Sequence, residues 1–290
     1  MQKLIEKIFI KLNLPESRNE SIRVFLETVS YYKLNPYVDF IKNNPQIVEK
    51  INKKTNGKDA WDAVTFLYRY NLKLSNAIYP YVYILETTLK TKINNLMCQT
   101  FGTEWYKDKA VFHKFNQRSI NYAERKAEDY LKEAHYPNVM DFAENYTTLG
   151  YWVAVIESGN FWNSQYIKIG NLFSANGKIN PATISTKELN KKLRTLNDLR
   201  NCISHYNRII GCKIDRKGYS NCRLKDVYAI IIYLFELLGC EDLNWMVGDI
   251  NCCPNGTFEL LYKEFEFIHS YDIKADKAQK PAPSELKHVK

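Results

Sequence analysis

Apolar residues recur at intervals of three and four through most of this 290-residue chain. That spacing places them on one face of a helix, whereas a half-buried strand would alternate with a period of two. No sustained alternation of period two occurs in the sequence. The pattern therefore predicts an all-α fold. The clearest expected helix face is formed by Ala63, Phe66, Leu67, Tyr70 and Leu74.

Polar and turn-forming stretches divide the chain into four expected parts. Residues 1–60 are expected to form an N-terminal helical segment packed on the core, and residues 61–240 the helical core. Residues 241–272 indicate a loop followed by a last helix. Residues 273–290 are rich in Lys, Ala and Pro and indicate a disordered tail.

Two prolines are expected to interrupt helices. Asn35 precedes Pro36 and is biased away from the helical conformation, which predicts a turn at this point. Pro80 is expected to break the long helical pattern that starts at Trp61.

The chain carries a formal net charge of +9, spread along its length without an arginine-rich tract. A basic folded surface favours an acidic partner, with nucleic acid as the first choice and an anionic membrane as the second. The longest apolar stretch, Val227 to Leu238, contains Glu236 and is too short to span a bilayer. We therefore expect no membrane partner.

Seven irregularly spaced cysteines and a start without a long apolar run indicate free thiols in a reducing cytoplasm. No Cys-x2-Cys pair is present, which disfavours a zinc site. The sequence also has no metal-ligand cluster and no glycine-rich phosphate loop. We expect neither a metal nor a cofactor.

The polar side chains of residues 193–211 are unusual for a helix surface. The stretch reads as one helix that ends at Gly211. Its expected core face is formed by Leu196, Leu199, Ile203, Tyr206 and Ile210. The opposite arc has neither Lys nor Glu, which an ordinary solvent face would carry; it consists of Arg194, Asn197, Asp198, Asn201, His205 and Arg208.

Within this helix, the run Arg200-Asn-Cys-Ile-Ser-His205 is an Arg-x4-His motif with a polar residue directly after the arginine. It resembles the signature of the HEPN superfamily of helical ribonucleases. Three further stretches resemble the bacterial Abi-like (AbiD/AbiF) abortive-infection family. They are residues 31–37, residues 74–90, which end in Leu-Glu-Thr-Thr-Leu-Lys, and residues 149–157.

The resemblance implies a HEPN-type helical bundle with extra N-terminal and C-terminal helices. It also implies a metal-independent endoribonuclease that acts in phage defence or as a toxin. In such chemistry, His205 would transfer protons because imidazole titrates near neutral pH, and Arg200 would stabilise the phosphate. Asn201 would orient the imidazole ring or bind the phosphate. One chain offers one such histidine, so a homodimer would supply the second proton-transfer group.

Several further residues are candidates for RNA contacts or for support of the site. Arg208, Asn207, Arg194 and Lys90 are expected to bind RNA. Glu86 and Ser204 are expected to support the site, with Ser204 as a small neutral residue and not a nucleophile. Glu86 and Lys90 form an i,i+4 pair, which fits a solvated helix pair as well as a supporting role.

RNA is thus the expected partner, as a substrate and as a non-coding antitoxin or guide. Two other interpretations stay open. One is a non-catalytic HEPN module in which the same residues only bind RNA, and the other is a helical scaffold or sensor that acts through protein contacts.

Overall fold

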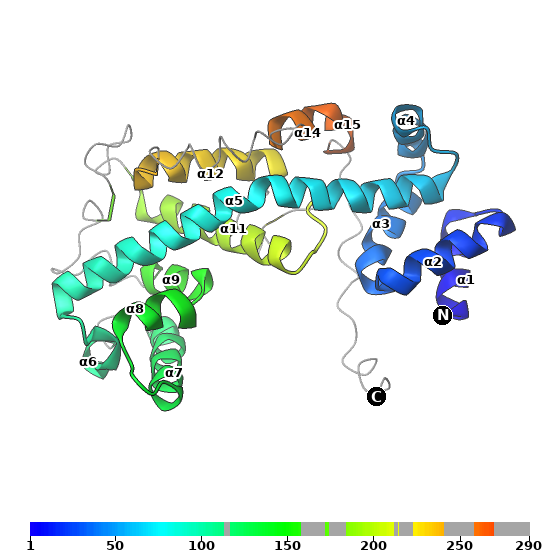
Figure 1. Cartoon of the computed structure of the whole chain (residues 1–290). Helices are drawn as coiled ribbons and strands as arrows, with labels where there is room; N and C mark the ends of the chain where they lie inside the picture. The colour runs from blue at the N-terminus through cyan, green and yellow to red at the C-terminus, as the bar shows by residue number, and fades with distance from the viewer. Residues whose placement is uncertain are drawn as a thin grey trace. The chain divides into compact units, whose positions relative to one another are not determined.

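The computed structural model describes residues 1–112, 117–157, 172–173, 184–211, 214, 223–240 and 258–269. Every regular element in these ranges is helical, which confirms the all-α prediction (Figure 1). The expected tail at residues 273–290 lies outside the described residues, as does most of the expected loop before the last helix. The expected boundaries at residues 60 and 240 stay predictions.

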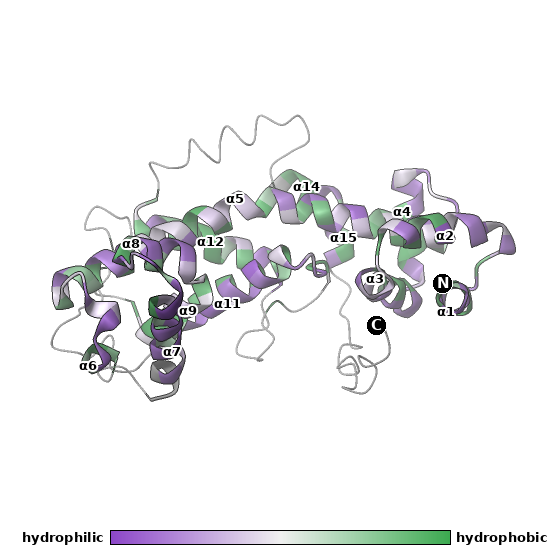
Figure 2. Cartoon of the chain, turned by 60° about the horizontal axis from the view of Figure 1, so that its bottom comes forward, coloured by the Kyte–Doolittle hydropathy of each residue, from purple (hydrophilic) through white to green (hydrophobic). Residues whose placement is uncertain are grey.

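The described residues form two compact units. The first lies within Met1–Lys73, Tyr206–Cys212 and Tyr262–Lys290, and the second within Leu74–His205 and Lys213–Leu261. Helix α5 (Ala60–Phe101) runs through both. The helices carry hydrophobic and hydrophilic residues along the same element, as amphipathic packing requires (Figure 2).

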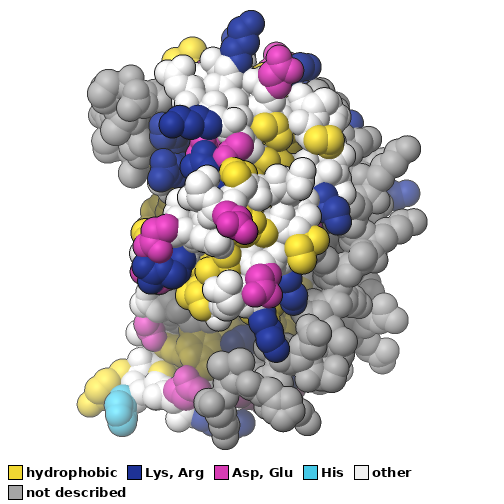
Figure 3. All heavy atoms as spheres, turned by 90° about the vertical axis from the view of Figure 1, so that its right-hand side faces the viewer, with side chains coloured by type: hydrophobic (Ala, Val, Ile, Leu, Met, Phe, Trp, Pro, Cys, Tyr) yellow, Lys and Arg dark blue, Asp and Glu magenta, His cyan; other side chains and the backbone are white. Residues whose placement is uncertain are grey.

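The first unit is built from short helices and the start of α5. The short helices are α1 (Gln2–Leu12), η1 (Glu16–Arg18), α2 (Asn19–Thr28), α3 (Tyr31–Asn43), α4 (Gln46–Thr55) and α15 (Glu266–His269). Helix α1 packs on α3 and α2. Arg18 donates to Asp59 at 2.6 Å and to Asp62 at 2.7 Å, which fixes η1 on the beginning of α5. Figure 3 shows that basic and acidic side chains are interspersed on the face that it draws, without a patch of one sign.

The second unit surrounds the remainder of α5. Its aromatic core includes Trp105, Phe142 and Trp152, with ring centroids of Trp105 and Trp152 5.9 Å apart. Helix α9 packs against both α7 and α11, and α11 also packs against α12. The elements are η2 (Trp105–Lys107), α6 (Lys109–Phe112), α7 (Gln117–Glu133), α8 (Val139–Asp141), the π-helical turn η3 (Phe142–Tyr146), α9 (Leu149–Ile156), α11 (Thr186–Ser204) and α12 (Leu224–Leu238). Helix α14 (Phe258–Glu264) begins in this unit.

The expected breaks at the two prolines are wrong, because α3 contains Pro36 and α5 contains Pro80. A proline inside a helix costs about 3 kcal/mol. Burial of one large apolar side chain contributes about 1.5–3 kcal/mol, so a few of them outweigh that cost. Leu34, Tyr37 and Val38 are buried around Pro36, and Ile78, Tyr81 and Val82 are buried around Pro80.

The expected helix over residues 193–211 is also corrected at its end. Helix α11 starts at Thr186 and stops at Ser204, and Tyr206 adopts a left-handed backbone with φ of 51°. Tyr206 is 62 % exposed and does not belong to the core. The buried Asn71 side chain accepts hydrogen bonds from the amides of Ile209 (2.8 Å) and Ile210 (3.3 Å). These amides thus find partners outside a helix, which lets the chain leave the helical path before Gly211.

Candidate active site

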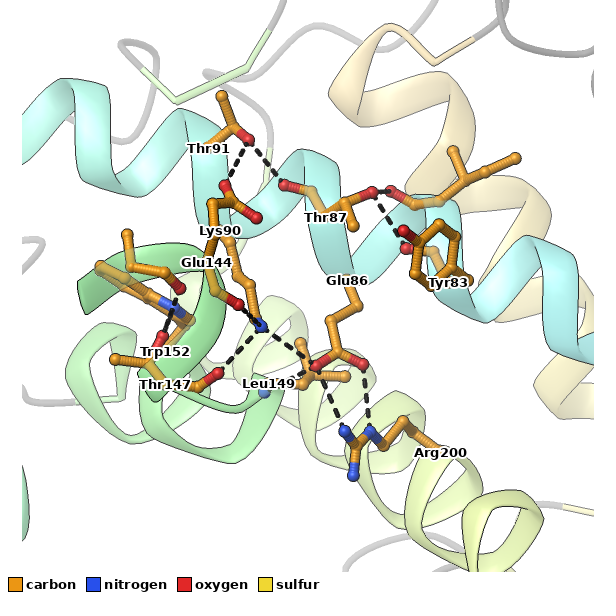
Figure 4. A network of polar contacts seen from close by, with 12 residues as sticks. Tyr83, Glu86, Thr87, Lys90, Thr91, Glu144, Thr147, Leu149, Trp152 and Arg200 are labelled. Atoms are coloured by element: carbon orange, nitrogen blue, oxygen red, sulfur yellow. Dashed lines mark hydrogen bonds and ion pairs between the residues drawn. The ribbon is translucent and has the colours of Figure 1, made fainter. Parts of the chain in front are cut away.

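The arginine of the Arg-x4-His motif is paired with a carboxylate from α5. Arg200 Nε donates to Glu86 Oε2 at 3.0 Å, and Arg200 Nη2 lies 3.5 Å from Glu86 Oε1 (Figure 4). The arginine side chain keeps 27 % of its surface exposed, whereas that of Glu86 keeps 11 %. The buried carboxylate therefore fixes the orientation of a guanidinium that solvent and ligands can still reach.

Glu86 itself is held from two further directions. Its Oε1 accepts a hydrogen bond of 3.2 Å from the backbone amide of Leu149, at the start of α9. The Lys90 ammonium lies 3.5 Å from the same oxygen. A carboxylate shared by an arginine, a lysine and a backbone amide has little freedom to rotate. Its position thus depends on α5, α9 and α11 together.

Lys90 belongs to this buried network. Its ammonium donates to the carbonyl oxygens of Thr147 at 2.9 Å and Glu144 at 3.4 Å, and only 7 % of the residue is exposed. Trp152 Nε1 donates to Thr147 Oγ1 at 2.7 Å and so helps to fix the turn that receives the lysine. The interpretation of Glu86 and Lys90 as a solvated pair is therefore wrong. The expectation that Lys90 contacts RNA does not fit this buried position either.

Two cations contact the carboxylate of Glu86. Arg200 and Lys90 contribute two cations against one carboxylate. The hydrogen bonds of Arg200 use Nε and Nη2, and its Nη1 forms none with the described residues. The guanidinium can therefore hold Glu86 on one edge and offer donors to an anion on another edge.

His205 lies where α11 ends. Its backbone amide still donates to the Asn201 carbonyl at 3.1 Å, and its backbone then leaves the helical path. His205 and Ser204 are exposed, and Asn201 is half-buried. The end of α11 thus places the exposed His205 one turn beyond Asn201.

Arg194 lies further back on α11, paired with Glu157 just after α9. The two helices also approach closely at Gly150, where an added Cβ would lie 3.3 Å from Asn197 Oδ1. Position 150 therefore favours glycine. The ion pair of Arg194 with Glu157 links α11 to the end of α9. This pair accounts for the position of the Arg194 side chain without a phosphate contact.

Asn207 and Arg208 lie in the first unit, so Arg208 does not continue the polar arc of α11 that the sequence pattern predicts. Lys33 Nζ donates to Asn207 Oδ1 at 3.1 Å, and Arg208 Nη1 donates to the Pro36 carbonyl at 2.6 Å. The Arg208 guanidinium also stacks 5.6 Å from the Phe40 ring centroid. Both residues anchor the segment after the motif on α3, which corrects the expected placement of Arg208 on the polar arc of the motif helix.

The sequence pattern does not identify two residues that contact the motif helix or the segment after it. Asn71 accepts hydrogen bonds from the segment after the motif. In the sequence it is marked only as a polar amide side chain among apolar helix positions. Glu157 pairs with Arg194, and nothing in its local pattern distinguishes it from a surface carboxylate.

Within the described ranges, no three His, Cys, Asp or Glu side chains lie together in a way that could hold a metal ion. None of the helices that the structure describes is long and apolar enough to cross a lipid bilayer.

Comparison with known proteins identifies one family. The model of the Abi-like protein family matches residues 24–211, which covers the Glu86–Lys90 pair and the whole Arg200–His205 motif. Searches of curated proteins and of solved structures find no match. The matched region spans well over half of the 290 residues, and the chain therefore belongs to the Abi-like protein family.

Proposed function

We propose that this protein is a metal-independent endoribonuclease of the HEPN type, which acts in phage defence or as a toxin. Membership of the Abi-like family associates the chain with abortive infection. The observation that carries the nuclease proposal is the pairing of Arg200 with the buried Glu86. Arg200 belongs to α11, and the exposed His205 follows directly after that helix. The motif thus places an oriented cation and a group that can transfer protons within six residues of one another in sequence.

The reaction begins at the ribose 2′-hydroxyl. A general base removes its proton, and the oxygen attacks the adjacent phosphorus to give a pentacoordinate phosphorane. Arg200 stabilises the added negative charge through donors that the Glu86 contact leaves unused. A general acid then protonates the departing 5′-oxygen. The products are a 2′,3′-cyclic phosphate and a 5′-hydroxyl end, with no other reactant consumed.

Two proton-transfer groups are required, whereas the motif supplies one histidine. We assign the second to His205 of another copy of the chain, so that two α11 ends complete one site. Asn201 supports this site by orienting the imidazole or by donating to the phosphate. The basic character of the chain fits RNA as substrate and a non-coding RNA antitoxin or guide as the controlling partner.

Mixing wild-type chains with an excess of His205→Ala chains tests this proposal. If each site needs two histidines, the mixed dimers are inactive and the activity per wild-type chain falls as the variant is added. An unchanged activity per wild-type chain would contradict the two-chain site. RNA binding without cleavage by the wild type would favour the non-catalytic HEPN module.

A further inference from the structure

Two exposed tyrosines stack on each other on α5. Tyr79 is 47 % exposed and Tyr83 is 54 % exposed, and their ring centroids lie 6.5 Å apart with 28° between the ring planes. Both belong to the same compact unit as Arg200 and His205. Large aromatic rings exposed as a pair leave apolar area in water that a ligand could cover.

The pair lies on a side of α5 that does not pack against α12. Tyr81, between them in sequence, is buried and packs against Tyr228 and Phe235 of α12 at 6.0 and 5.8 Å between ring centroids. Successive residues of a helix turn by about 100°, so residues two apart point roughly 200° from each other. Tyr79 and Tyr83 therefore point away from α12.

The same geometry relates the pair to the candidate active site. Tyr79 is seven residues before Glu86, about two helical turns, and thus lies on nearly the same face about 10 Å along the axis. Helices α5 and α11 run in opposite directions (Figures 1 and 2). The step from Glu86 back to Tyr79 therefore follows the same direction as the step from Arg200 to His205. Figure 4 shows Tyr83 about one turn of α5 from Glu86.

We propose that Tyr79 and Tyr83 form a stacking platform for unpaired bases of single-stranded RNA that extends from the Arg200–His205 site. The inference rests on the proposed nuclease function and names its substrate as RNA with unstacked bases. Aromatic side chains bind bases of any sequence through their π-faces, each contributing about 1–3 kcal/mol. The net charge of +9 favours an anionic ligand such as RNA.

Binding of a fluorescent oligoribonucleotide to the full chain tests the platform. The measurements use the His205→Ala background, so that RNA is not cut during the titration. Removing both rings with Tyr79→Ala and Tyr83→Ala should weaken binding of the single strand by about tenfold or more. The Tyr79→Phe, Tyr83→Phe variant keeps the π-faces and should bind as the parent does. Tyr136→Ala removes another tyrosine, 90 % exposed, and is the matched control without an effect.

Two further probes separate base stacking from phosphate binding. A duplex of the same sequence and a single strand with abasic positions offer phosphates without accessible bases, and their affinity should not respond to the double alanine change. Unchanged affinity for the intact single strand would overturn the platform, as would conversion of a dimer to monomers by the alanine variant in light scattering. Cleavage by the wild type with unchanged single-strand binding would reject the platform alone, whereas absence of cleavage would reject the proposed nuclease.

Discussion

Glu86 and Arg200 are separated by 114 residues, yet Arg200 Nε donates to Glu86 Oε2 at 3.0 Å. The carboxylate also accepts a hydrogen bond from the Leu149 amide and forms an ion pair with the Lys90 ammonium. The orientation of the motif arginine is therefore set by α5 and α9, and not by α11 alone. This dependence leads to predictions about stability as well as about activity.

Removal of the Glu86 carboxylate should destabilise the fold. Glu86→Ala leaves the buried Lys90 ammonium without its carboxylate, and loss of one member of a buried ion pair costs about 3 kcal/mol. The double change Glu86→Ala, Lys90→Met removes the orphaned charge and should recover part of that loss. Urea denaturation of the three proteins measures the free energies of unfolding. As a control, Glu128→Ala breaks an exposed pair with Lys109 and should leave stability nearly unchanged. Equal stability of Glu86→Ala and wild type would contradict the buried network.

The guanidinium shape of Arg200 should matter beyond its charge. Arg200→Lys keeps a cation opposite Glu86 but cannot hold the carboxylate and a phosphate through separate edges. We expect the first-order rate of RNA cleavage to fall by about 10²-fold, the scale of losing one oriented donor in a transition state. Single-turnover cleavage with enzyme in excess measures this rate. A lysine variant as active as wild type would show that a point charge is sufficient.

Asn71 should be important for stability although it lies outside the motif. Asn71→Ala removes acceptors for the amides of Ile209 and Ile210 and a donor to the Asn207 carbonyl, which lies 3.2 Å from Nδ2. Each buried group left without a partner costs about 1–3 kcal/mol. A loss of about 3 kcal/mol is therefore expected in thermal or urea unfolding. Asn76→Ala changes an exposed position of the same helix and should have little effect on stability. Comparable losses for both variants would contradict the role of the Asn71 hydrogen bonds.

Acid should destabilise the first unit through His269. Burial lowers the pKa of His269 to about 4, and its ring stacks on Tyr262 at 4.2 Å between centroids. The unfolded chain therefore binds a proton near pH 6.5 that the folded chain does not bind until about pH 4. Stability is fully present above pH 6.5 and decreases as the pH falls toward 4, by about 2 kcal/mol between pH 7 and 5.

His269→Phe keeps a ring in this position and removes the titrating group. Its free energy of unfolding should therefore fall less between pH 7 and 5 than that of the wild type, by the roughly 2 kcal/mol assigned to the histidine. Identical pH dependence of the two proteins would show that His269 does not contribute to acid sensitivity.

The sequence pattern predicts the helical class and the pairing of Glu86 with Lys90, because both follow from local periodicity. It does not predict that α11 ends at Ser204, since the alternative partner for the following amides is Asn71, more than 130 residues earlier. It also places Arg208 on the wrong element for the same reason. The expected helix breaks at Pro36 and Pro80 do not occur, because burial of apolar side chains on both sides of each proline stabilises the helix. Local rules thus identify candidate residues, and long-range contacts decide which of them share a site.

The central proposal is that Arg200 and His205 cut RNA through the 2′-hydroxyl. The most direct measurement incubates wild type and His205→Ala with a defined RNA in the presence of EDTA and determines the chemistry of the new ends. We predict 2′,3′-cyclic phosphate and 5′-hydroxyl ends from the wild type, and no cleavage by a variant with unchanged circular dichroism and unfolding. Cleavage by His205→Ala at the wild-type rate, or no cleavage by the wild type under any tested condition, would contradict this proposal.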